Sequence, residues 1–118
     1  MSAIAYKLVD LGEWEAARAA GAYEGSAVDR ADGYIHMSTA EQLAETARRH
    51  YAGQTRLLLV EVELEGLGQA LRWEASRGGA LFPHLYAPLP LATARSERRL
   101  SVDPDGRPIF EDGAAGWP

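Results

Sequence analysis

The chain contains no cysteine, and this absence excludes several kinds of chemistry. Disulfide bonds, thiolate nucleophiles and cysteine-ligated zinc or iron–sulfur sites are all ruled out. The sequence also has no apolar run approaching the ~20 residues that a membrane helix needs, and its N-terminus lacks a secretory pattern. We therefore expect a cytoplasmic protein without a membrane partner.

Basic residues are not in surplus either, since the formal net charge is −5. Proteins that bind nucleic acids in general usually carry a basic excess, so we expect no general nucleic-acid binding. The chain has no dinucleotide-binding glycine motif, Walker loop, zinc-protease helix motif or nucleophile elbow. Its partner is expected to be a small molecule, and no pattern predicts an oligomeric state.

The composition is that of one globular domain: 118 residues, 47% apolar and 25% charged. We expect a single α+β domain over residues 1–110 and a disordered tail over 111–118. Capping boxes begin helices after Asp10 and at Ser38, and these helices end near Gly21 and Gly53. The intervening residues 22–33 are predicted to form a loop. Strands are expected at 4–9, 34–37, 56–64, 70–74, 92–102 and 107–110, with a proline-rich extended segment on a sheet edge at 81–91.

The segment Asp32–Glu41 holds the first candidate for chemistry. His36 lies in a short apolar strand, and Ser38 follows at the start of a helix. An imidazole with an ordinary pKa of ~6.5 can transfer protons or bind a ligand near neutral pH. The alternative is a core histidine bonded to a backbone carbonyl, with Ser38 serving only as the helix cap.

A second candidate is the run R-W-E-A-S-R-G-G at residues 72–79. Arg72 and Arg77 could hold phosphate or carboxylate groups, Trp73 could stack on a base, and Glu74 could polarise a hydroxyl. The alternative is an edge strand with a surface Arg–Glu pair.

The third candidate is L-F-P-H-L-Y at residues 81–86, in which His84 and Tyr86 add an imidazole and a phenol. A proline-stiffened apolar segment packed on the sheet would explain the same residues. His36, Glu74 and His84 together could supply nitrogen and oxygen ligands to a metal, although their spacing does not require one.

From these motifs the chain is identified as a member of the bacterial family called domain of unknown function 952. The resemblance extends from about Tyr6 to about Arg95. It is carried by G-S-A-V-D-R-A-D-G-Y-I-H-M-S-T-A-E-Q and by L-R-W-E-A-S-R-G-G-A-L-F-P-H-L-Y. The family has no established activity.

The family is grouped by fold with the ADP-ribosyltransferase-like superfamily, and the chain most resembles the RNA 2′-phosphotransferases in it. The resemblance implies an ADP-ribosylation-like fold, with a mixed or antiparallel sheet covered by two N-terminal helices. It also implies a cleft for a nucleotide-like ligand. Those enzymes carry a His-Gly-Ser/Thr motif after an opening tyrosine, whereas Tyr6 is followed here by Lys7 and Leu8. NAD is thus a candidate cofactor that no motif of this chain implies.

Two functional hypotheses remain open. In the first, the cleft binds a nucleotide or ADP-ribose-like ligand, with His36 and Glu74 as catalytic residues of a transferase. Ser38, Arg72, Trp73, Arg77, His84 and Tyr86 would then contact the ligand. In the second, the chain is a small-ligand or protein-binding module that has lost the chemistry of the superfamily.

Overall fold

The main sheet of the computed structural model has four antiparallel strands in the order β1-β4-β8-β9. The structure describes residues 3–118, except for the side chain of Arg77. The strands span Ile4–Asp10 (β1), Leu57–Glu63 (β4), Ala94–Val102 (β8) and Pro108–Phe110 (β9). Strand β4 lies between β1 and β8, and its residues Leu57 to Val60 are all buried, as expected for an apolar run covered on both faces.

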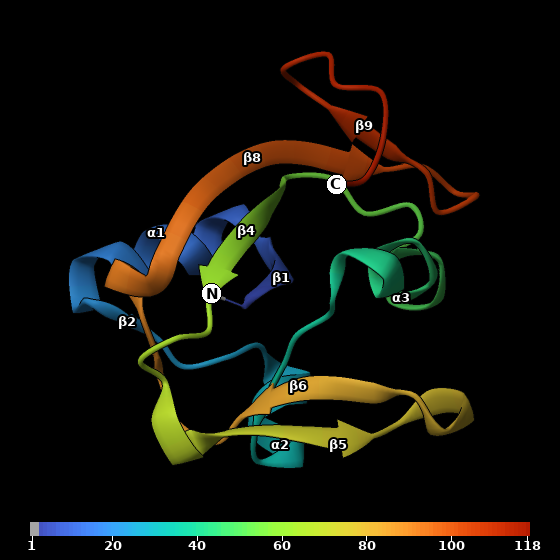
Figure 1. The fold of residues 1–118 in the computed structure, drawn as a ribbon. Coiled ribbons are helices and arrows are strands. Elements are labelled where there is room, and N and C mark those ends of the chain that lie inside the picture. The colour runs from blue at the N-terminus through green and yellow to red at the C-terminus, as the bar shows by residue number, and fades with distance from the viewer. Residues whose placement is uncertain (1–2) are drawn as a thin grey trace.

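A second antiparallel sheet lies below the first in Figure 1, in the order β3-β6-β5. Its strands are Ile35–His36 (β3), Leu71–Ala75 (β5) and Leu81–Leu85 (β6). His36 lies directly opposite His84 in the β3–β6 pair. A short pair of strands, Ala22–Tyr23 (β2) and Leu89–Pro90 (β7), completes the sheet structure of the described residues.

Two apolar clusters lie on opposite faces of the main sheet. One joins helix α1 (Leu11–Ala20) to the second sheet and includes Trp14, Val60 and Leu85. The other joins helix α3 (Leu43–His50) to the main sheet and includes Leu43, Leu59 and Leu100. Because side chains alternate along a strand, neighbouring residues of β1 face different clusters. The prediction of an α+β fold is confirmed.

The structure has a third helix where the sequence predicted a loop. Helix α2 spans Ala27–Asp32, so the picture of only two helices in the N-terminal half is wrong. The Ser26 hydroxyl accepts a hydrogen bond from the Asp29 N–H, and the Asp29 carboxylate accepts one from the Ser26 N–H, which forms a capping box. Gly33 ends it in the left-handed conformation. The helix has six residues and is therefore too short to show a clear helical periodicity.

The cap of the next helical segment lies one residue later than predicted. Thr39, not Ser38, accepts a hydrogen bond from the Gln42 backbone, and Gln42 accepts one from Thr39. This segment begins with a 3-10 turn at Ala40–Gln42 and continues as α3. The Ser38 hydroxyl instead lies 3.0 Å from the hydroxyl of Thr46.

Replacing Thr39 with alanine should lower the free energy of unfolding by about 1 kcal/mol, because the Gln42 N–H loses its acceptor. Urea unfolding measures this loss. Thr39→Ser keeps the hydroxyl and should stay within about 0.5 kcal/mol of the parent. Equal losses in the two variants would contradict the assignment of Thr39 as the cap.

The proline-containing strand β6 is central in its sheet and not at an edge as predicted. Pro83 is tolerated there because β3 pairs with β6 only through Ile35 and His36. The missing N–H of Pro83 lies just beyond this pairing, while its carbonyl accepts a hydrogen bond from the Met37 backbone.

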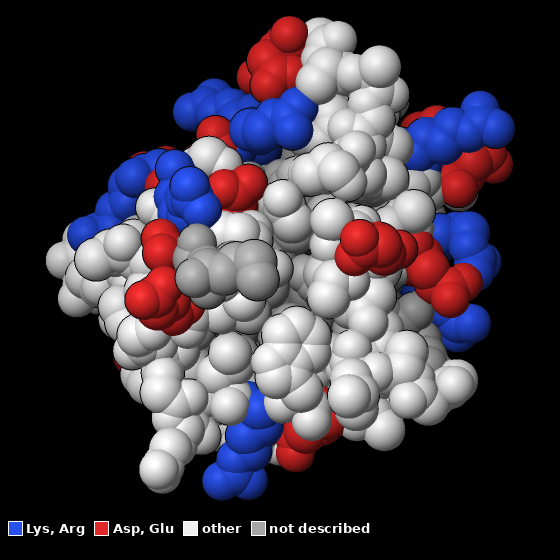
Figure 2. All heavy atoms as spheres, in the orientation of Figure 1, with Lys and Arg blue, Asp and Glu red and all other residues white. Residues whose placement is uncertain are grey.

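The turn at Asp103–Gly106 connects β8 to β9, and residues 111–118 follow β9. In residues 111–118, for which the sequence predicts disorder, the Trp117 ring lies 5.9 Å from Phe110 and packs against the α3 cluster. On the face shown in Figure 2, acidic and basic side chains are interspersed and form no large patch of one sign. No helix among residues 3–118 is both long and apolar enough to cross a membrane.

Candidate functional site

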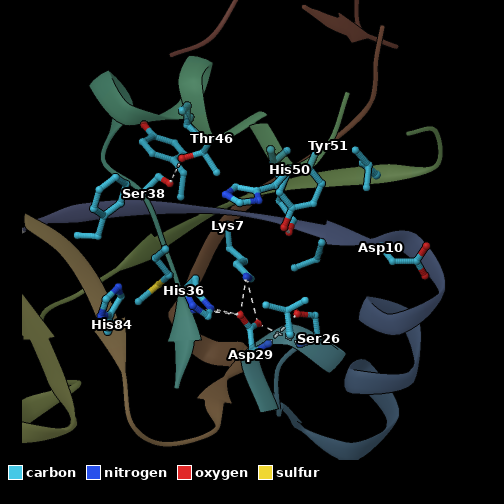
Figure 3. Close-up of a pocket in the computed structure, with 18 of the residues that line it drawn as sticks. Lys7, Asp10, Ser26, Asp29, His36, Ser38, Thr46, His50, Tyr51 and His84 are labelled. Atoms are coloured by element: carbon cyan, nitrogen blue, oxygen red, sulfur yellow. Dashed lines mark hydrogen bonds and ion pairs between the residues drawn. The ribbon is translucent and has the colours of Figure 1, made fainter. Parts of the chain in front are cut away.

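A cavity of about 550 Å³ lies along the outer edge of β1, bordered by α2, β3 and α3. The backbone of β1 is open along this edge because it pairs with the segment after β3 through a single bridge. In this bridge the backbones of Tyr6 and Ser38 exchange two hydrogen bonds. Figure 3 shows Lys7 and His36 near Asp29, with Thr46 and His50 on the α3 side of the cavity. The volume is that of a typical small-molecule site.

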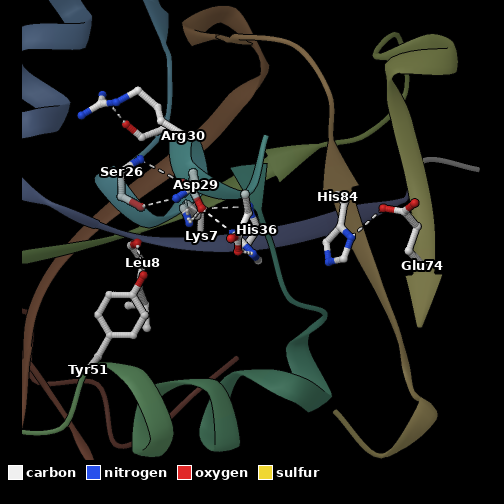
Figure 4. A network of polar contacts seen from close by, with 11 residues as sticks. Lys7, Leu8, Ser26, Asp29, Arg30, His36, Tyr51, Glu74 and His84 are labelled. Atoms are coloured by element: carbon white, nitrogen blue, oxygen red, sulfur yellow. Dashed lines mark hydrogen bonds and ion pairs between the residues drawn. The ribbon is translucent and has the colours of Figure 1, made fainter. Parts of the chain in front are cut away.

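Asp29 is the centre of the polar network in this wall, and only 2% of its surface is exposed. Its carboxylate lies 3.0 Å from the Lys7 ammonium and 2.6 Å from Nδ1 of His36. It also accepts hydrogen bonds from the backbone N–H groups of Ser26 and His36. Asp29 therefore connects strand β1, the start of helix α2 and strand β3 (Figure 4).

These contacts set the charge of the buried pair. Burial alone would raise the pKa of Asp29, but the hydrogen bond from His36, the charge of Lys7 and the two backbone donors hold it well below the usual range. Burial lowers the pKa of Lys7, and the Asp29 carboxylate opposes that effect. Asp29 is consequently ionised at neutral pH.

His36 lies between two carboxylates. Its Nδ1 contacts the buried Asp29, and its Nε2 lies 2.9 Å from Asp32, the last residue of α2. Asp32 is half exposed and the His36 side chain is 34% exposed, so solvent reaches the Asp32 side of the ring. A ligand anion could take the place of the Asp32 carboxylate without disturbing the buried contact to Asp29.

His84 is held in a similar way but is almost fully buried. Its Nδ1 lies 2.8 Å from Glu74, which also accepts a hydrogen bond of 2.7 Å from the Tyr86 hydroxyl. These bonds from Tyr86 and His84 lower the pKa of Glu74. The Arg72 guanidinium lies 4.7 Å from the centre of the Tyr86 ring.

Tyr34 holds the two histidines side by side. Its ring stacks on His84 with centroids 4.2 Å apart and tilts against His36 at 4.6 Å. The His36 and His84 rings are 5.6 Å apart and nearly perpendicular. All three rings line the cavity.

The structure brings together only part of the predicted site. His36, Ser38 and His84 line the cavity, whereas Glu74, Arg72 and Tyr86 lie behind or beside His84 and are not among its lining residues. Trp73 is 44% exposed and points to the face of β5 opposite Glu74, as strand alternation requires. The side chain of Arg77 lies outside the part of the chain that the structure describes.

Three residues of the site did not emerge from the sequence: Lys7, Asp29 and Tyr34. A signal for Lys7 was present, because it is the only lysine of the chain and interrupts an apolar strand. Asp29 lies in the segment 22–33, which was predicted to be a loop, and the sequence therefore gave no reason to expect a buried carboxylate there. Among residues 3–118, no group of three His, Asp or Glu side chains is placed to hold a metal ion.

Comparison with known proteins identifies the family. The chain is 52% identical to protein CC0527 from Caulobacter crescentus, whose crystal structure superposes with a TM-score of 0.85 and covers 91% of this chain and 94% of that one. The solution NMR structure of CC0527 gives a TM-score of 0.78 over 95% of this chain and 97% of that one. No curated protein matches. Residues 8–96 match the family described as protein of unknown function (DUF952), and the chain belongs to this family, as its motifs predicted.

Proposed function

We propose that the cavity binds a nucleotide or ADP-ribose-like ligand in the cytoplasm and that the protein is a transferase acting on it. The observation that carries this proposal is the wall formed by Lys7, Tyr34, His36 and His84 in a cavity of about 550 Å³. Imidazole groups bind phosphate, and an aromatic ring offers a surface for a base or a ribose. The resemblance to ADP-ribosyltransferase-like enzymes supports the same ligand class.

Arg72 and Tyr86 extend this wall in the proposal. The guanidinium lies over the phenol ring beside His84, where it could meet a phosphate at the rim of the cavity. Trp73 faces away from them and takes no part in the binding that we propose.

A ligand-binding module without chemistry is the second candidate, and the position of Lys7 favours it. In the transferases that the chain resembles, the opening tyrosine is followed by a ribose-binding histidine. Here the residue after Tyr6 is a lysine whose ammonium is occupied by Asp29. Turnover of a bound ligand distinguishes the two candidates.

Thermal unfolding with NAD, ADP-ribose and a 2′-phosphorylated RNA oligonucleotide at millimolar concentration tests the binding. A ligand present at about 100 times its Kd should stabilise the protein by about 2.7 kcal/mol. His36→Gln should reduce the shift, while Glu65→Gln, an exposed position after β4, should leave it unchanged. If none of the three compounds raises the melting temperature of the parent protein, the proposal is wrong.

A further inference from the structure

His36 and His84 share a feature that ligand binding alone does not require. Each imidazole presents Nδ1 to a carboxylate, Asp29 for His36 and Glu74 for His84. A carboxylate at Nδ1 fixes the orientation and the tautomer of the ring, because that nitrogen must carry the proton. Nε2 is then the atom of each ring that can exchange a proton with a ligand.

The two rings are also placed to act on one group. They are direct cross-strand neighbours on β3 and β6, so both project from the same face of the sheet into the cavity. Their centroids are 5.6 Å apart, which allows two oxygens of a single phosphate to meet one ring each. In Figure 4 the second nitrogen of His84 points away from Glu74, toward the side of His36.

The surroundings of the two rings differ in one respect that assigns their roles. His36 has carboxylates at both nitrogens, and only a ring with two N–H groups can donate to both. His84 has one carboxylate, and its Nε2 makes no hydrogen bond to another of the described residues. His36 is therefore placed to give a proton, and His84 to take one.

We propose that His36 and His84 form a general acid–base pair that hydrolyses a phosphodiester of mononucleotide size, an inference that rests on the proposed ligand class. Nε2 of His84 removes a proton from water as the water oxygen bonds to phosphorus. The bond from phosphorus to the leaving oxygen breaks, and that oxygen takes the proton from Nε2 of His36. The products are a phosphomonoester and a hydroxyl group, and solvent returns the proton from His84 to His36.

Asp29 and Glu74 act through the rings in this scheme and are positioning residues. Asp32 occupies the place of the substrate oxygen at His36 and must move aside, which its half-exposed position at the end of α2 allows. Charged and titratable groups around the pair are Lys7 beside Asp29, Arg72 beside Glu74, and the phenols of Tyr34 and Tyr86.

Hydrolysis of adenosine 2′,3′-cyclic phosphate by the full chain tests the proposal, with adenosine monophosphate measured by chromatography. We expect turnover to follow a bell-shaped pH profile, because one ring must be neutral and the other charged. His36→Gln and His84→Gln should each lower kcat by at least ~100-fold. Glu65→Gln should keep the parent rate.

Glu74→Gln separates a positioning role from a structural one. It should shift one limb of the pH profile and lower kcat more than it raises KM, whereas a purely structural residue would leave the profile in place. Calorimetric titration with adenosine monophosphate is run in parallel. Binding without hydrolysis by the parent protein would overturn the acid–base pair and leave the proposed function standing. Failure to bind either nucleotide would overturn the acid–base pair as well, and the thermal unfolding test with NAD, ADP-ribose and 2′-phosphorylated RNA would then decide the proposed function.

Discussion

Replacing Lys7 with methionine should lower the free energy of unfolding by about 3–5 kcal/mol, because it removes the buried ammonium group from the buried Asp29 carboxylate. The loss exceeds that expected for a surface pair, since both side chains are at most 5% exposed. Urea unfolding at pH 7 measures it. Because methionine is similar in length and apolar, a change in packing contributes little.

The loss in the free energy of unfolding caused by Lys7→Met should become smaller at acidic pH. The pKa of Asp29 is depressed in the folded protein, so the stability linked to its charge is present above its unfolded value of ~3.9 and is lost as the pH falls below it. Once Asp29 is protonated, the missing cation matters less.

The double variant Lys7→Met/Asp29→Asn provides the control. It removes both charges and keeps an amide oxygen for the His36 N–H. It should be more stable than Lys7→Met alone, since no uncompensated charge remains. If the loss in the double variant equals the sum of the losses in Lys7→Met and Asp29→Asn, the two residues do not interact.

Gly25→Ala is expected to cost about 2–5 kcal/mol through two separate effects. Gly25 has φ +101°, which costs a residue with a Cβ about 1–2 kcal/mol. Its Cβ would also lie 2.7 Å from the Cβ of Asp29 and 3.3 Å from its carboxylate, and overpacking of this kind costs about 1–3 kcal/mol. The substitution should therefore push Asp29 away from Lys7 and His36.

Gly33→Ala is the matched control for this substitution. Gly33 has a similar φ of +89°, but a Cβ there would meet nothing within 4 Å. It should show the backbone cost alone, about 1–2 kcal/mol. Urea unfolding of both variants measures the difference, and equal losses would mean that contact with Asp29 adds nothing.

The regular elements with clear apolar patterns were predictable. The strand around Leu57–Val60, the helix from Asp10 to Gly21 and the hairpin after Asp103 all appear where the sequence indicated. Helix α2 was missed because six residues carry too little periodicity to outweigh the turn-forming residues around them. Its capping box was present as Ser26 and Asp29, and this was the overlooked signal.

The site was less predictable than the fold because it depends on pairing between distant strands. His36 and His84 could be named as candidates, but only the register of β3 against β6 places them opposite each other. The partner of Asp29 is 22 residues away in β1. A charge pattern read along the chain cannot show that Lys7 points to the side of the sheet where Asp29 is buried.

The strand order β1-β4-β8 has a consequence for how the chain must fold. Strand β4 pairs with β1 and β8, and neither connection is a short hairpin. The chain must therefore close long loops before the sheet gains any of its central hydrogen bonds, and topologies of this kind fold slowly. During that interval the run from Leu57 to Val60 has no strand on either side. It is the segment through which two incompletely folded chains would first associate.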